Sequence, residues 1–206
     1  MSVEASASIS LHDKVRHKIT WFRVPLMTIA TLILVGFIHN IKAFWIGVPI
    51  AYFGELLQIW AASQLHKDKH FTISGPYSHM RNPMYTGRFF LGLGFFIMTW
   101  NPFMIAGYII LFAAYAQARV GREERRLKVI FEPDYQHYCS EINRWLPKFK
   151  AYSKSESKNA SWAQVCANHE QLNLYGMTPL LIALYFRIGM FAVWCQSHIY
   201  NWCIFK

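Results

Sequence analysis

Two polar segments of the sequence, residues 69–88 and 119–147, hold the side chains best suited to chemistry. In the second segment, Arg119 and Glu123 are four residues apart, so in a helix they lie on one face and place a guanidinium beside a carboxylate. Such a pair could hold an anionic group of one ligand next to a cationic group of another. The alternative is an exposed helix with ordinary ion pairs, which is the commoner case for an arbitrary sequence.

Apolar runs surround these segments and predict that membrane helices position them. Of the 206 residues, 54% are hydrophobic and 16% charged, whereas about a quarter of an average soluble protein is charged. Several runs approach the ~20 residues that cross ~30 Å of hydrocarbon. We predict an all-α, multi-pass membrane helical bundle with about five transmembrane helices, at residues 24–41, 43–62, 83–100, 105–118 and 174–195.

Helix start signals and composition divide the chain further. Asn82-Pro83 and Asn101-Pro102 each combine an N-cap residue with a proline at the first helical position. We predict an N-terminal segment at 1–23, a core at 24–150 and a C-terminal extension at 151–206. The extension would contain an amphipathic stretch at 162–174 before its last transmembrane helix.

The basic residues predict the orientation in the membrane. Eighteen of the 21 Lys and Arg residues fall on one side if the N-terminus is cytoplasmic, in agreement with the positive-inside rule. Both polar segments then lie on the cytoplasmic face, of a bacterial inner membrane or of the endoplasmic reticulum. We therefore read the net charge of +10 as orientation and expect no nucleic-acid partner. The start of the chain does not resemble a cleavable signal peptide, and the four cysteines show no spacing typical of a disulfide or metal site.

Together the two segments resemble the isoprenylcysteine carboxyl methyltransferase family and its wider group of membrane methyltransferases, which includes phospholipid N-methyltransferases. The resemblance extends over residues 43–149, and its motifs agree in order and spacing. The residues that carry it are Gly75-Pro76-Tyr77, Arg81-Asn82-Pro83-Met84-Tyr85-Thr86-Gly87, Asn101-Pro102, Glu123-Glu124 with Leu127, Tyr135, Tyr138 and Pro147.

The resemblance implies transfer of a methyl group from S-adenosylmethionine to a lipidic or amphipathic acceptor, such as a prenylated one, taken from the bilayer. Arg119 matches the substrate-holding arginine of the family and is the implied catalytic residue. The implied cofactor contacts are Lys69, His70, Phe71, Thr72, Tyr77, Asn82, Pro83, Met84, Tyr85 and Glu123.

The cofactor carries an ammonium, a carboxylate, an adenine and a sulfonium, and these residues can supply the carboxylate, donors and aromatic walls that it needs. A carboxylate or thiolate acceptor arrives already charged, so we expect alignment and exclusion of water to contribute more than a general base. No strand followed by GxGxxG occurs, which argues against a Rossmann methyltransferase.

The identity of the acceptor stays open. A carboxyl group of an isoprenylcysteine-like lipid is our first expectation, and a phospholipid amine or a thiol is the second. Asn82 replaces the histidine common in the family, and Glu141 stands where carboxyl-methylating members often have arginine, three residues before Arg144. An NADPH-dependent enzyme like the sterol reductases and a non-catalytic membrane protein are the alternatives outside methyl transfer.

Other charged residues have less certain roles. Glu55 and Arg187 lie inside predicted membrane helices, where an ionisable group costs several kcal/mol unless it is paired or hydrated. We consider a pairing between these two, and for Glu55 a helix-packing hydrogen bond as well as a place in the pocket. We expect Glu124 to form a surface ion pair with Lys128, four residues on.

Overall fold

Helices make up all the regular structure that the computed structural model describes, which covers residues 28–66, 71–156 and 158–204. The chain divides into two units, Met1–Phe37 and Ile38–Lys206; in the first, residues 28–36 are helical. The described part of the second unit contains α2 (Ile41–Ala62), η1 (Gly75–Ser78), α3 (Pro83–Met98), α4 (Pro102–Ile130), α5 (Asp134–Glu141), α6 (Trp162–Ala167) and α7 (Gln171–Ile204). The all-helical prediction is therefore confirmed for these residues.

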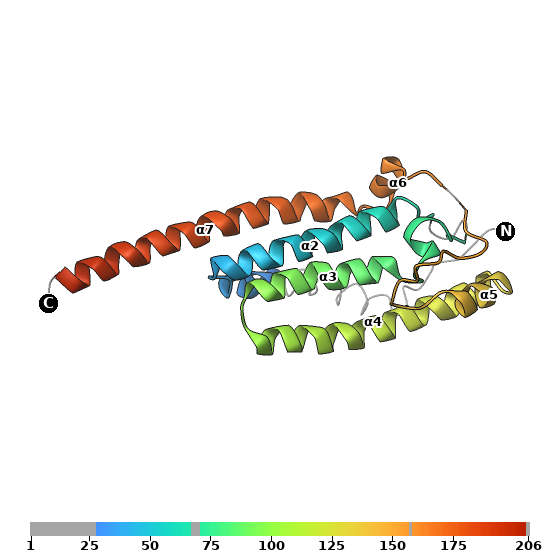
Figure 1. Cartoon of the computed structure of the whole chain (residues 1–206), viewed down its shortest axis with the longest axis horizontal. Coiled ribbons are helices and arrows are strands. Elements are labelled where there is room, and N and C mark those ends of the chain that lie inside the picture. Colours follow the sequence, from blue (N-terminus) through green and yellow to red (C-terminus); the bar gives the residue numbers. More distant parts are fainter. Residues whose placement is uncertain (1–27, 67–70, 157, 205–206) are drawn as a thin grey trace, which may run out of the picture. The chain divides into compact units, whose positions relative to one another are not determined.

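Two of the described helices, α2 and α4, are long and apolar enough to cross a membrane. In the second unit, α3 packs against α2 on one side and α4 on the other, while α7 packs along α2 (Figure 1). Tryptophan, phenylalanine and isoleucine side chains remain exposed on the outer sides of these helices. Exposed apolar side chains in such number fit a hydrocarbon solvent rather than water.

Small residues let α2 and α3 approach closely. A Cβ added to Gly54 would lie within 3 Å of the backbone of Gly87 and Leu91, and one added to Gly94 would lie within 3 Å of Gly47 and Ala51. Glycines therefore meet glycines across the interface at two levels, seven residues apart on each helix. Close backbone approach through small residues is how membrane helices gain van der Waals contact.

The helix starts follow the sequence with one exception. The Asn40 and Asn101 side chains cap α2 and α4, with Oδ1 of Asn101 accepting from the amides of Phe103 and Met104 at 3.0 and 3.2 Å. Asn82 precedes α3, and Pro83 opens it as predicted, but the Asn82 side chain makes no cap hydrogen bond. It is engaged elsewhere, as described below.

The helix ends depart further from the predictions. α3 ends at Met98, two residues before the predicted end. By contrast, α4 continues without a break through its charged half to Ile130, in agreement with the prediction that Arg119 and Glu123 share one helix face. The stretch predicted as one amphipathic segment is two elements, α6 and the start of α7, because Asn168 and His169 turn the chain between them. α5 was not predicted.

Candidate active site

The predicted charge pair lies on the part of α4 that follows its apolar half. Arg119 Nε lies 3.3 Å from Glu123 Oε1, and both side chains are about half exposed. The Tyr85 hydroxyl, from the first turn of α3, donates to the same Oε1 at 2.8 Å. Both contacts use one oxygen of Glu123, and within the described residues Oε2 has no partner. The carboxylate therefore keeps an oxygen with which to accept from a ligand's ammonium.

A second ion pair continues this network toward α7. The Arg88 guanidinium lies 5.5 Å from the centroid of the Tyr85 ring, and its Nη2 lies 3.1 Å from Oε1 of the buried Glu170. Asn173 Nδ2 donates to the other Glu170 oxygen at 2.9 Å. The sequence analysis assigned no role to Arg88 or Glu170; an acid four residues before the apolar run at 174–195 was the available signal. Polar contacts thus connect α4, α3 and α7.

Tyr77, in η1, lies within electrostatic reach of Glu170, Arg88 and Glu123. Its ring packs against Ala61, Ala62 and Met84, and its carbonyl accepts from the Tyr138 hydroxyl at 2.5 Å. Burial, together with Tyr138 and the nearby carboxylates, raises the pKa of Tyr77 well above its ordinary value. Its ring is therefore neutral at physiological pH and offers an apolar wall with a hydroxyl at its edge.

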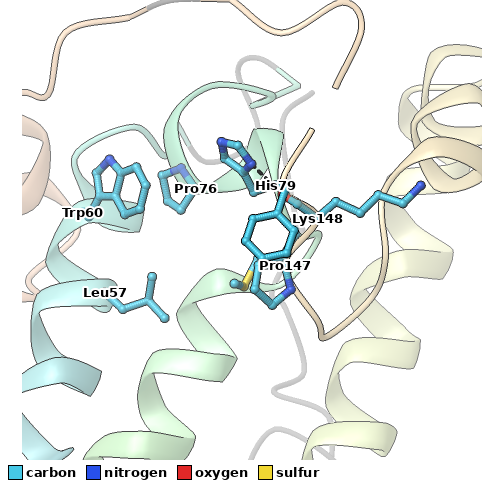
Figure 2. A pocket seen from close by; sticks show the side chains of 8 residues that line it. Leu57, Trp60, Pro76, His79, Pro147 and Lys148 are labelled. Carbon is cyan, nitrogen blue, oxygen red and sulfur yellow. Dashed lines mark hydrogen bonds between the residues drawn. The ribbon is translucent and has the colours of Figure 1, made fainter. Parts of the chain in front are cut away.

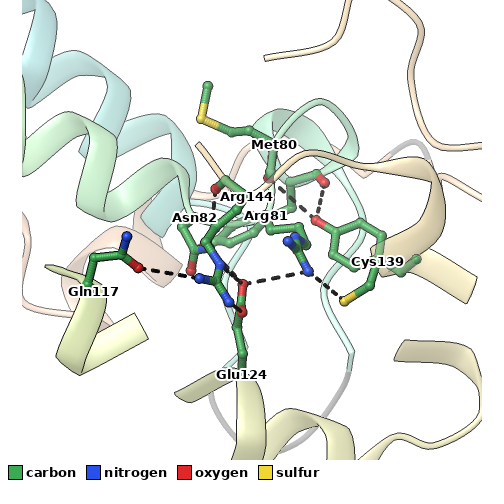
Figure 3. A network of polar contacts seen from close by, with 9 residues as sticks. Met80, Arg81, Asn82, Gln117, Glu124, Cys139 and Arg144 are labelled. Atoms are coloured by element: carbon green, nitrogen blue, oxygen red, sulfur yellow. Dashed lines mark hydrogen bonds and ion pairs between the residues drawn. The ribbon is translucent and has the colours of Figure 1, made fainter. Parts of the chain in front are cut away.

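Glu124 is not a surface residue as predicted but belongs to a mostly buried polar network with Arg81, Asn82 and Arg144. Its carboxylate pairs with Arg144, lies 3.7 Å from Arg81 Nη1 and accepts from Asn82 Nδ2 at 3.3 Å (Figure 3). Its side chain is 11% exposed. The prediction of a surface pair with Lys128 is therefore wrong, because two arginines from segments distant in sequence converge on this acid.

The same network accounts for Asn82 and Arg144. Asn82 Nδ2 also donates to the Arg144 carbonyl at 3.3 Å, so this amide joins the start of α3 to the segment after α5 instead of capping the helix. Arg81 Nη1 donates to Cys139 Sγ at 2.8 Å. These contacts fasten the polar segments that flank the Arg119–Glu123 pair.

The remaining predicted residues are placed as follows. Phe71 stacks on Phe131 at 5.4 Å between ring centroids and meets Tyr138 edge-on at 5.2 Å, in a buried aromatic cluster. The side chains of Pro83 and Met84 are buried, so a ligand would meet their backbone, and Thr72 is half-buried. Lys69 and His70 lie outside the described residues.

The two charges predicted inside membrane helices do not pair with each other. Arg187 donates to the backbone carbonyl of Ile38 instead, so the pairing with Glu55 is wrong. Glu55 is fully buried and accepts from Gln58 Nε2 at 3.4 Å. Glu141, which stands where an arginine was expected from the family, accepts from the backbone and the hydroxyl of Ser153.

An apolar pocket of about 300 Å³ opens where the end of α2, η1 and the segment after α5 meet. The basic residues His79 and Lys148 are among those that line this pocket. His79 Nδ1 lies 2.8 Å from the backbone carbonyl oxygen of Lys148 (Figure 2). A cavity of this size and chemistry suits part of a hydrocarbon chain. Its lining residues are Leu57, Trp60, Pro76, His79, Met80, Pro147, Lys148 and Phe149.

Comparisons with known proteins confirm the family resemblance. A profile described as phospholipid methyltransferase matches residues 26–134, just over half of the 206 residues. The chain is 29% identical over 117 residues to the protein-S-isoprenylcysteine O-methyltransferase of Xenopus laevis. That alignment covers 51% of this chain and 41% of the relative, so the chain spans about two fifths of the relative's length. No solved structure matches the chain.

Proposed function

The chain belongs to the phospholipid methyltransferase family, and on this premise we propose that it is an integral membrane enzyme that methylates a lipidic acceptor. Members of the family use S-adenosylmethionine. The proposal includes about five spanning helices, the division at residues 23 and 150, and an active site on the cytoplasmic face. The observation that carries it is the hydrogen-bonded set of Arg119, Glu123 and Tyr85 at the end of an apolar helical span.

The residues present fit the cofactor. When bound, S-adenosylmethionine supplies an electrophilic methyl group on a sulfonium. The free Oε2 of Glu123 can accept from its ammonium, and the aromatic faces of Tyr77 and Tyr85 suit its cationic and apolar parts. The segment from Asn82 to Tyr85 and the stretch at 69–72 would complete the cofactor contacts.

Arg119 is suited to the acceptor. Its Nε contacts Glu123, its guanidinium also interacts with the Tyr85 hydroxyl, and its side chain is half exposed. N–H groups of the guanidinium that face solvent can therefore bind a carboxylate or a phosphate. A carboxylate held there is already a nucleophile, and the chain need only align it and exclude water. The apolar pocket beside His79 and Lys148 is suited to part of its hydrocarbon chain. We therefore favour carboxyl O-methylation of an isoprenylcysteine-like lipid.

A phospholipid amine is the second candidate acceptor. The matching family is described by phospholipid methylation, and Glu141 takes the place of a second acceptor-binding cation. The Arg144 side chain, three residues later, is already paired with Glu124. Arg119 would then bind the lipid phosphate.

The test uses the full chain purified in detergent and methyl-labelled S-adenosylmethionine. The acceptors are S-farnesyl-N-acetylcysteine, phosphatidylethanolamine in mixed micelles, and a small alkyl thiol. A carboxyl ester releases labelled methanol in base, whereas N-methyl and S-methyl products do not. Arg119→Ala should lose turnover and keep cofactor binding, whereas Glu123→Ala should lose binding. Saturable binding of NADPH alone would indicate a reductase, and binding of neither nucleotide would indicate a non-catalytic protein.

A further inference from the structure

The interior between α2 and the start of α7 contains polar oxygens that lack donors. Glu55 and Gln58 lie one turn apart on α2, and they are 0% and 1% exposed. Gln58 Nε2 donates to Glu55 Oε2, but within the described ranges no donor reaches Glu55 Oε1 or Gln58 Oε1.

The charges around Glu55 favour binding of a positively charged group there. Glu55 interacts with the Leu174 backbone amide and with the Glu170 carboxylate, which repels it. Glu170 is itself compensated by Arg88 and Asn173. Among the described residues, no cation pairs with Glu55.

A structural role alone explains this arrangement poorly. An uncompensated buried carboxylate costs several kcal/mol within a membrane helix, and a glutamine at position 55 would hydrogen-bond to Gln58 without that cost. A bound group that satisfies the site must bring both N–H donors and positive charge. An alkylammonium has three donors and one charge.

We propose that Glu55 and Gln58 form a binding site for an alkylammonium group. The proposal rests on the proposed function, since its second candidate acceptor, an ethanolamine phospholipid, carries such a group in its headgroup. The ammonium of the cofactor, which the proposed function gives to Glu123, is the competing occupant that the first test below distinguishes. The location is suitable because Tyr77 lies within electrostatic reach of Glu170, Arg88 and Glu123. Glu170, which Glu55 also senses, therefore connects the buried site to Tyr77 and the polar network of the candidate active site.

The cofactor is tested with two probes, S-adenosylhomocysteine and its desamino analogue. Wild-type protein in detergent should prefer the amine-bearing probe by about tenfold to a hundredfold, as expected for a hydrogen bond to a charged group. If the cofactor's ammonium occupies the site, Glu55→Gln should bring this ratio close to one and leave the affinity for the desamino probe unchanged. Glu132→Gln, at an exposed glutamate, is the matched control and should retain the ratio.

The lipid is tested with phosphatidylethanolamine and its N-acetyl derivative, which has no ammonium. Both carry brominated acyl chains, so quenching of tryptophan fluorescence in mixed micelles reports their relative affinities. If Glu55→Gln abolishes the preference for the free amine in this pair, the headgroup is the ligand. Gln58→Met removes one acceptor at similar volume and should reduce whichever preference is present several-fold.

Two results would overturn the site. The first is that monodisperse Glu55→Gln protein keeps every preference of the wild type for the amine-bearing probes. If Glu55→Gln does not fold, the same result for Gln58→Met has the same meaning. The other is a wild-type protein with no such preference in either pair. If S-adenosylhomocysteine does not bind to wild type, the proposed function fails, and the lipid pair alone decides the site.

Discussion

Replacing Glu124 by alanine should destabilise the protein much more than the same change at Glu123. Glu124 is 11% exposed, and its two cationic partners, Arg81 and Arg144, are 16% and 36% exposed. Removing one member of a fully buried pair costs roughly 3–5 kcal/mol. Because water reaches Arg144, we expect a loss of about 2–3 kcal/mol for Glu124→Ala. Glu123 is 44% exposed, and an exposed ion pair contributes at most about 1 kcal/mol.

The assay is thermal unfolding in detergent, followed by a dye that fluoresces when it reacts with newly exposed thiols such as Cys139 and Cys166. For a chain of this length, a loss of 2–3 kcal/mol corresponds to a Tm lower by roughly 4–12 °C. Glu123→Ala should shift the Tm by no more than a few degrees but lose cofactor binding. Equal Tm shifts for the two variants, or a larger shift for Glu123→Ala, would refute the separation of a supporting acid from a binding acid.

Three further predictions concern other parts of the second unit. Tyr85→Phe removes the hydroxyl that orients the carboxylate of the site, and titration with S-adenosylhomocysteine should show binding about tenfold weaker; unchanged affinity would contradict its positioning role. Gly54→Ala should reduce the yield of monodisperse protein in gel filtration, because the added methyl meets backbone within 3 Å, whereas Gly107→Ala has open space and should behave as wild type. Hydrogen bonds from Ser153 lower the pKa of the Glu141 carboxyl, so their stabilisation is present above the unfolded-state pKa and is lost as pH falls through the folded-state value. Limited proteolysis near Ser153 should therefore accelerate in acid for wild type and be less pH-dependent for Ser153→Ala; identical pH profiles would contradict it.

Local signals were sufficient for the longer helices and for one contact of the site, but not for α5 or the separate α6. The Asn101-Pro102 start and the i,i+4 spacing of Arg119 and Glu123 depend on residues close in sequence, so they could be predicted without knowledge of the fold. Length and hydropathy likewise predicted α2 and the apolar half of α4. Each of these features depends only on residues within one helix, which is why it can be predicted from the sequence.

Contacts between distant segments could not be predicted in this way. Glu124 resembles any acid on an exposed helix until Arg81 and Arg144 are brought to it, since its partners lie 43 and 20 residues away in the printed sequence. The Arg88–Glu170 pair, 82 residues apart, is a similar case. The sequence also gave no sign that Asn82 would donate its amide across the site instead of capping α3.

Because α4 is unbroken, its length fixes the distance between Pro102 and the Arg119–Glu123 pair, and this distance can be compared with the thickness of the bilayer. At 1.5 Å per residue, Arg119 and Glu123 lie roughly 26 and 32 Å along the axis from Pro102, which brackets the ~30 Å of the hydrocarbon layer. A thicker membrane would draw the guanidinium and the carboxylate into oil, and a thinner one would lift them toward water. We therefore expect turnover in vesicles to pass through a maximum as the acyl chains of the host lipid are lengthened.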